Sequence, residues 1–144
     1  MLENQLLIIF GASGDLTRRK LIPALFELYR EKLLPPHFAI LGIGRTALTT
    51  PVFRKNMHAA LSEGLKPGDR TAGEIDNFTA VLHYLSVETS DPEAYAAVKE
   101  LIMQLDNEYK TDGNCLFYLA TPPDLYEIIA RNLSLQGLNR NESS

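Results

Sequence analysis

Residues 6–16 read LLIIFGASGDL, a continuous apolar run followed by a turn that contains two glycines. The apolar run predicts a strand that is buried on both faces, as in a parallel sheet. From Asp15 to about Glu31 leucines recur at helical spacing, so the turn joins a strand to a helix. Pro23 lies inside this helix and is expected to kink it or to break its first half.

The same alternation of an apolar run and a helical pattern continues along the chain. In chain order, the sequence predicts strands at residues 6–10, 38–43, 81–87 and 115–120, and helices at 15–31, 50–62, 92–109 and 124–135. Thr50 is the expected N-cap of the second helix, and Ser90 or Asp91 that of the third. Residues 64–77 are polar and predict a loop with at most a helical turn.

This alternation of strands and helices predicts an α/β fold with three layers. The sheet is expected to be parallel and doubly wound, with right-handed crossovers and the strand order 3-2-1-4. That arrangement is a Rossmann-type fold. Its ligands bind where the strand order reverses, next to the carboxyl ends of the first and fourth strands.

The chain has 144 residues, 45% of them hydrophobic and 22% charged, which suits a globular protein and excludes disordered and fibrous classes. A formal net charge of −4 argues against nucleic-acid and anionic-membrane partners. The sequence shows neither a signal-peptide pattern nor an apolar run of about 18 residues, so a cytoplasmic location is expected. The single cysteine, Cys115, excludes an internal disulfide, and no metal site is expected.

The glycine turn, residues 11–16, is the strongest functional signal. Gly11 and Gly14 leave room for a phosphate to approach the backbone, and amides at the helix N-terminus bind such an anion. Asp15 is the expected N-cap of this helix. The spacing is not G-x-G-x-x-G, because Thr17 stands at the third glycine position. Similar turns occur in α/β proteins that bind no nucleotide, and on the motif alone that alternative stays open.

The end of the second strand indicates which dinucleotide would bind. Proteins that prefer NAD usually carry Asp or Glu there for the ribose diol. Here Arg45 holds that position with Thr46 beside it, and a guanidinium can hold a 2′-phosphate in a forked contact. NADP is therefore favoured over NAD, and the alternative is an arginine that only solvates a loop.

Three motifs, in this order along the chain, resemble the glucose-6-phosphate dehydrogenase family: IFGASGDLTRRKLIP at 9–23, GIGR at 42–45 and FYLATPPDLY at 117–126. The resemblance implies an oxidoreductase of glucose metabolism, in the oxidative pentose phosphate pathway. This enzyme oxidises glucose 6-phosphate to 6-phosphogluconolactone and passes a hydride to NADP. The resemblance also implies an NADP-binding domain over residues 1–138 and a polar tail, 139–144, that leads to a substrate and catalytic domain.

By the same resemblance, residues at the ends of all four strands bind the cofactor. They are Gly11, Ala12, Ser13, Gly14, Asp15, Leu16, Arg45, Thr46, Ser86, Val87, Ala120, Pro122 and Tyr126. Lys20 matches a lysine near the substrate and the nicotinamide, and its alternative role is that of a solvated lysine at a helix start.

The catalytic motifs of the family do not occur in this sequence. The resemblance places the general base on a histidine within RIDHYLGK and another substrate lysine within EKPFG, and neither string is present. His37, His58 and His83 have no carboxylate motif nearby and are expected to be structural or solvated. The chain alone is therefore expected to bind NADP at most and to be inactive.

Two other readings stay open. The chain is alternatively a standalone module that binds no nucleotide and acts in protein association, including as a homo-oligomer, because an unpaired sheet edge favours association. A short-chain reductase would need a Tyr-x-x-x-Lys pair, and Tyr95 with Lys99 has that spacing. That pair precedes the fourth strand, which argues against this reading.

Overall fold

The computed structural model describes residues 3–63 and 71–138. In these ranges one parallel sheet contains β1 (Gln5–Phe10), β2 (Phe38–Gly44), β3 (Leu82–Ser86) and β4 (Cys115–Leu119). The strand order is β3-β2-β1-β4, which confirms the predicted order 3-2-1-4. Because all the pairings are parallel, the strands end at one common edge of the sheet.

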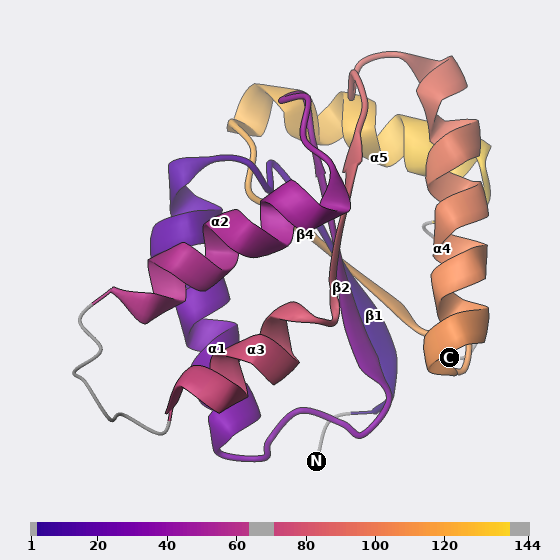
Figure 1. Cartoon of the computed structure of the whole chain (residues 1–144). Coiled ribbons are helices and arrows are strands. Elements are labelled where there is room, and N and C mark those ends of the chain that lie inside the picture. Colours follow the sequence, from indigo (N-terminus) through magenta and orange to yellow (C-terminus); the bar gives the residue numbers. More distant parts are fainter. Residues whose placement is uncertain (1–2, 64–70, 139–144) are drawn as a thin grey trace.

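Helices cover both faces of the sheet, so the three-layer α/β prediction is confirmed (Figure 1). The helices α1 (Ile22–Arg30), α2 (Thr50–Ser62) and α3 (Thr71–Thr79) pack on one face. The helices α4 (Tyr95–Tyr109) and α5 (Tyr126–Leu135) pack on the other. Short 3₁₀ turns, η2 (Pro92–Ala94) and η3 (Pro123–Leu125), precede α4 and α5.

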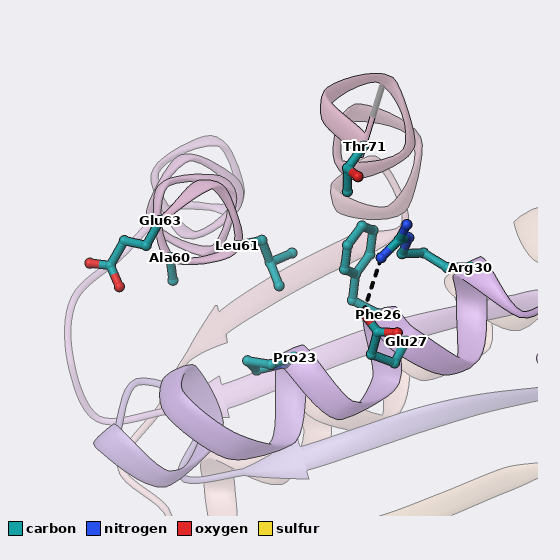
Figure 2. A pocket seen from close by; sticks show the side chains of 8 residues that line it. All are labelled: Pro23, Phe26, Glu27, Arg30, Ala60, Leu61, Glu63 and Thr71. Atoms are coloured by element: carbon teal, nitrogen blue, oxygen red, sulfur yellow. Dashed lines mark hydrogen bonds and ion pairs between the residues drawn. The ribbon is translucent and has the colours of Figure 1, made fainter. Parts of the chain in front are cut away.

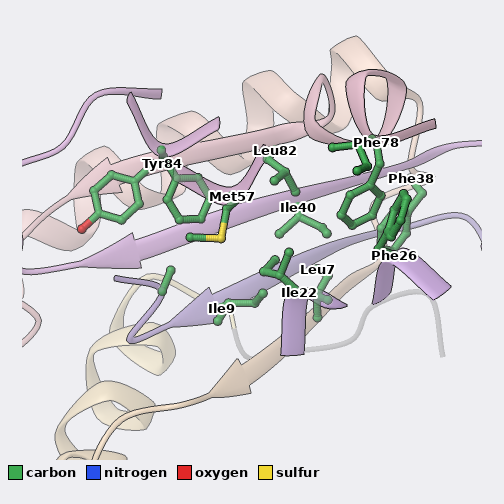
Figure 3. Close-up of a cluster of buried hydrophobic side chains, with 13 residues drawn as sticks. Leu7, Ile9, Ile22, Phe26, Phe38, Ile40, Met57, Phe78, Leu82 and Tyr84 are labelled. Carbon is green, nitrogen blue, oxygen red and sulfur yellow. The ribbon is translucent and has the colours of Figure 1, made fainter. Parts of the chain in front are cut away.

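The strand β1 contributes to two hydrophobic cores, one on each face. Leu7 and Ile9 join the core under α1, α2 and α3, whereas Leu6 and Ile8 join the core under α4 and α5. Successive side chains of a strand point to opposite faces, so a strand covered on both sides reads as a continuous apolar run. Figure 3 shows the first core, where the ring centroids of Phe26 and Phe78 lie 5.4 Å apart.

The helix α3 was not predicted. Ile75 and Phe78 of α3 are buried, and their spacing puts both side chains on the face toward the sheet. Tertiary packing therefore makes a helix of a segment whose composition is polar and includes Gly73. The loop prediction is wrong for residues 71–77, and residues 64–70 lie outside the described ranges, as does the tail 139–144.

The first helix begins irregularly, as Pro23 led us to expect. A π-helical turn, η1 (Thr17–Leu21), precedes α1, and the Ile22 amide donates to the carbonyl of Thr17. Pro23, at the start of α1, has no amide for a regular helical hydrogen bond, and local π turns are one way in which helices accommodate such a break.

Two of the predicted helix caps are wrong. The carboxylate of Asp15 lies 3.2 Å from a guanidinium nitrogen of Arg18 and caps no backbone amide. At the start of α2, Thr49 rather than Thr50 accepts from the amide of Val52, at 3.3 Å. Before α4 the predicted cap Asp91 is present, since it accepts from the Glu93 amide at 3.0 Å and so caps the turn η2 that leads into this helix.

Candidate coenzyme-binding site

The glycine turn lies where the carboxyl ends of β1, β2 and β4 meet. Gly11 has a φ of +85°, and a Cβ on it would lie 2.7 Å from the carbonyl oxygen of Ala120. The close backbone approach and the left-handed conformation both require glycine there. The amides of Gly11 and Ala12 donate to the carbonyl of Ile43 at 2.8 and 3.1 Å. These contacts fix the turn against two neighbouring strand ends.

Hydrogen bonds from Gly14 and Thr17 stabilise the turn internally. The Gly14 amide and the Thr17 hydroxyl both donate to the carbonyl of Gly11, at 3.0 and 3.2 Å. Thr17 is fully buried, so at the third glycine position a hydroxyl fastens the turn to the helix. The Gly14 amide is therefore bonded within the turn.

The remaining amides of the turn lead into the helix. The Arg18 amide donates to the Gly14 carbonyl at 3.3 Å, and the amides of Asp15 and Leu16 precede that bond. The first amides of a helix have no helical acceptor, and they carry the positive end of its dipole. Among the hydrogen bonds of the described ranges, none uses the amide of Ser13. The amides of Ser13, Asp15 and Leu16 are thus available to an anion.

Cationic side chains follow the turn directly. Arg18 and Arg19 lie 3.2 and 3.8 Å from the carboxylate of Asp15, and all three side chains are exposed. Exposed ion pairs of this kind are weak, so these guanidinium groups can leave Asp15 for an anionic ligand. Lys20 is exposed, and within the described ranges its side chain has no hydrogen bond or ion pair.

The end of β2 touches the turn through Tyr84 of β3. A Cβ on Gly44 would lie 2.6 Å from the Tyr84 hydroxyl oxygen and 2.9 Å from Oγ of Ser13. The same hydroxyl donates to the carbonyl of Thr46 at 2.8 Å. Burial raises the pKa of Tyr84, against a smaller opposing effect of Ser13, so the phenol stays a donor at neutral pH. Tyr84 therefore holds Arg45 and Thr46 beside the turn.

Arg45 has a partner that the sequence did not reveal. Its Nε lies 3.2 Å from Oε2 of Glu88, and the Arg45 side chain is 70% exposed. The hydroxyl of Ser90 donates to the other carboxylate oxygen, Oε1, at 3.0 Å. Hydrogen bonds from Ser90, and to a lesser extent the charge of Arg45, hold the pKa of Glu88 below its usual range. The one available signal was the position of Glu88 just beyond the third strand.

The other predicted cofactor residues lie at the same edge of the sheet. Ser86 ends β3 and is exposed, and the amide of Val87 donates to the Gly44 carbonyl at 2.9 Å. Pro122 is exposed before the turn η3, and Tyr126, the first residue of α5, is 41% exposed.

Thr121, which the sequence reasoning passed over, also lies at this edge. Its backbone nitrogen lies 3.1 Å from the position of a Cβ on Gly11. Its hydroxyl is buried and has no hydrogen-bond partner among the described residues. A buried hydroxyl without a partner is costly, so this oxygen is available to a ligand or a water molecule.

The three histidines lie away from this edge. His58 has the carboxylate neighbour that the sequence analysis did not expect, because its Nε2 lies 2.6 Å from Oδ1 of Asp76 and joins α2 to α3. His83 contacts the hydroxyl of Tyr109 at 2.8 Å, and His37 is exposed before the start of β2. None of the three is placed to act on a ligand at the glycine turn.

The short-chain reductase reading is excluded by the surroundings of Tyr95. This side chain is fully buried under the sheet, and its hydroxyl donates to the carbonyl of Thr89 at 2.8 Å. A catalytic tyrosine must reach its substrate, so Tyr95 and Lys99 do not form such a pair.

Hollows flank α2, and two of them also touch the helix that follows the glycine turn. One, of about 340 Å³, is lined by Ser13 and Arg18 at the glycine turn and by Phe53 and Met57 of α2. The other, of about 330 Å³, lies between α1, α2 and α3, where Figure 2 shows Arg30 bonded to Glu27. Of these two, the first adjoins the predicted cofactor residues, through Ser13.

The arrangement at the sheet edge suits a dinucleotide. It combines a turn with no room for a side chain at Gly11, first-turn amides that suit a pyrophosphate, and a guanidinium at the end of β2. In residues 3–63 and 71–138 no group of three or more His, Cys, Asp or Glu side chains is placed to hold a metal. No helix in these ranges has the length and hydropathy to cross a membrane.

Comparison with known proteins places the chain in a family. The family model described as "Glucose-6-phosphate dehydrogenase, NAD binding domain" matches residues 8–144. Glucose-6-phosphate 1-dehydrogenase of Treponema pallidum is 42% identical over 139 residues, which cover 96% of this chain and 27% of the relative. The enzyme of Aggregatibacter actinomycetemcomitans is 43% identical over 143 residues, which cover 97% of this chain and 28% of the relative.

Solved structures agree with this assignment. A glucose-6-phosphate dehydrogenase in complex with its substrate glucose 6-phosphate superposes with a TM-score of 0.83 at 34% identity, covering 98% of this chain and 28% of that one. The chain spans little more than a quarter of the curated relatives it matches, 27% and 28% for the two above. The chain therefore belongs to the glucose-6-phosphate dehydrogenase family and carries the part of it that the family model describes as the NAD-binding domain.

Proposed function

We propose that this chain is the NADP-binding part of an enzyme that oxidises glucose 6-phosphate to 6-phosphogluconolactone. The observation that carries the proposal is the contact of Gly11 with the backbone of Ala120, which sets an amide-rich turn at the reversal of strand order. Relatives whose names state this activity support the choice of reaction. The reading as a module that binds no nucleotide has no comparable support.

Each group at the sheet edge then has a role. The amides of Ser13, Asp15 and Leu16 hold the pyrophosphate, while Arg45 and Thr46 hold the adenosine 2′-phosphate. Ser86 and Val87 lie on the adenine side.

The end of β4 serves the other half of the cofactor. Ala120, Pro122 and Tyr126 contact it there, and Lys20 faces the sugar phosphate. When bound, NADP supplies the acceptor for the hydride from C1 of the sugar, and this chain orients it.

Turnover needs a general base, and the described residues place no histidine at the site. A base must take the proton of the C1 hydroxyl, and the three histidines lie elsewhere. We therefore assign residues 1–138 to the coenzyme domain and the base to another part of the enzyme. With no helix suited to a membrane in the described ranges and a net charge of −4, we place its work in the cytoplasm, without nucleic-acid or membrane partners.

Calorimetric titration of the chain with NADP and with NAD tests the proposal. We expect NADP to bind more tightly than NAD, and we expect no NADPH to form when glucose 6-phosphate is added. Circular dichroism shows whether the protein is folded in the same buffer. A folded chain that gives no heat with either dinucleotide contradicts the proposal.

A further inference from the structure

We propose that Glu88 limits the preference of this chain for NADP over NAD, by competing with the adenosine 2′-phosphate for Arg45. The inference rests on the proposed function, because it requires that Arg45 faces the 2′-phosphate. It assigns a specificity-determining role to a carboxylate that follows the third strand, whereas the usual acidic determinant of NAD preference follows the second.

The backbone brings these two side chains together. The amide of Val87 donates to the Gly44 carbonyl at 2.9 Å, which extends the pairing of β2 and β3 by one residue. Arg45 and Glu88 follow Gly44 and Val87 directly, so they leave the sheet side by side. Their charged groups meet with Nε of Arg45 3.2 Å from Oε2 of Glu88.

Ser90 fixes the carboxylate in this position. Its hydroxyl and its amide donate to Oε1 of Glu88 at 3.0 and 3.4 Å. The other oxygen, Oε2, is the one turned toward Arg45. Since hydrogen bonds and the guanidinium keep the pKa of Glu88 low, the carboxylate is charged at neutral pH.

This carboxylate affects the two dinucleotides differently. A 2′-phosphate that approaches Arg45 meets a negative charge already bound to the guanidinium and must displace or tolerate it. The 2′-hydroxyl of NAD carries no charge, and it can donate a hydrogen bond to a carboxylate. Glu88 therefore weakens the binding of NADP and does not oppose the binding of NAD. Both side chains are at least half exposed, at 70% and 50%, so solvent screening keeps the effect modest.

The substitution Glu88→Gln keeps the shape of the side chain and removes its charge. We expect the dissociation constant for NADP to fall by about three- to tenfold in low salt, with that for NAD changed by less than about twofold. The gain should shrink at high salt. Glu31→Gln is the matched control, because Glu31 is an exposed carboxylate just beyond the far end of α1. It should leave both dissociation constants unchanged.

The variant Arg45→Gln tests the role of Arg45 in NADP binding separately from the role of Glu88. If Arg45→Gln leaves NADP affinity unchanged, the assigned role of Arg45 is wrong and the inference fails with it. If Arg45→Gln weakens NADP while Glu88→Gln has no effect or also weakens NADP, only the inference is overturned. In the Arg45→Gln background we expect the gain from Glu88→Gln to fall below about twofold, and a full gain there would contradict competition for Arg45.

Discussion

Among single residues, Gly11 is the position in the turn that tolerates no side chain. Its φ of +85° and the 2.7 Å from a Cβ to the Ala120 carbonyl oxygen are two separate penalties. Gly113 offers a matched comparison, because its φ is +73° and nothing lies within 4 Å of its Cβ position. The two positions share the conformational penalty and differ in the steric one.

We therefore expect Gly11→Ala to lower the free energy of unfolding more than Gly113→Ala. The shared backbone strain costs roughly 1–2 kcal/mol, and the clash with Ala120 should at least double this for Gly11→Ala. Urea denaturation of both variants gives the two values. Equal losses would show that the contact between the ends of β1 and β4 is not as close as described.

The residues around Arg45 also show where sequence reasoning stops. Arg45 follows an apolar run, and that position alone identified it. Tyr84 and Thr46, in contrast, are 38 residues apart, and their hydrogen bond leaves no local pattern in the sequence. The pairing of Arg45 with Glu88 was hidden for the same reason, since it depends on the register of β2 and β3. Partners of this kind are set by the register of neighbouring strands, and the sequence predicted the strand order without the register.

At the scale of elements, the outer edge of β3 is closed by α2. Arg54 donates from Nε to the carbonyl of Leu82 at 2.7 Å, and the amide of Tyr84 donates to the Thr50 hydroxyl at 3.0 Å. These bonds occupy backbone groups that would otherwise pair with another strand. The expectation that an open edge favours association therefore does not apply here. It applies to β4, where Leu116 and Tyr118 are 55% and 41% exposed.

His83 connects three elements at that edge, and this predicts how stability responds to pH. It lies 3.5 Å from Arg54 of α2 and 2.8 Å from the hydroxyl of Tyr109 of α4. Burial, and next the charge of Arg54, lower the pKa of His83. The unfolded chain therefore binds the proton more readily than the folded one, and stability is lost as the pH falls through the ordinary histidine value of about 6.5.

Chemical denaturation at pH 7.5 and at pH 5 measures this dependence. We expect a lower free energy of unfolding at pH 5 than at pH 7.5 and a smaller difference in the variant His83→Gln, which cannot take up the proton. If His83→Gln shows the same difference between the two pH values as the starting chain, the effect belongs to other groups.

The helices and strands could be predicted where their buried residues form a regular pattern along the sequence. The strands β1 and β2 are buried on both faces and read as apolar runs, so their place and order followed from the alternation with helices. The helix α3 was missed because the apolar spacing of Ile75 and Phe78 covers only one helical turn within a polar segment. Its helical state depends on the contact of Phe78 with Phe26 in α1, which no local signal reports.

Across the molecule as a whole, basic side chains are concentrated where the carboxyl ends of the strands lie. The chain carries a net charge of −4, yet Arg18, Arg19, Lys20 and Arg45 follow the ends of β1 and β2. The first-turn amides add their positive partial charge at the same place. An anionic dinucleotide is therefore attracted to this edge although the protein as a whole is acidic. The hollow of about 330 Å³ among α1, α2 and α3 lies outside this basic edge.

We propose that the glycine turn and the end of β2 hold the cofactor. Nuclear magnetic resonance of the ¹⁵N-labelled chain tests this placement, because it follows the backbone amides as NADP is added. We expect the largest shifts at the amides of Ser13, Asp15 and Leu16 and around Arg45, with little change at Phe26 and Leu61 in the hollow of Figure 2. Shifts that centre on that hollow and leave the glycine turn unchanged would contradict the claim.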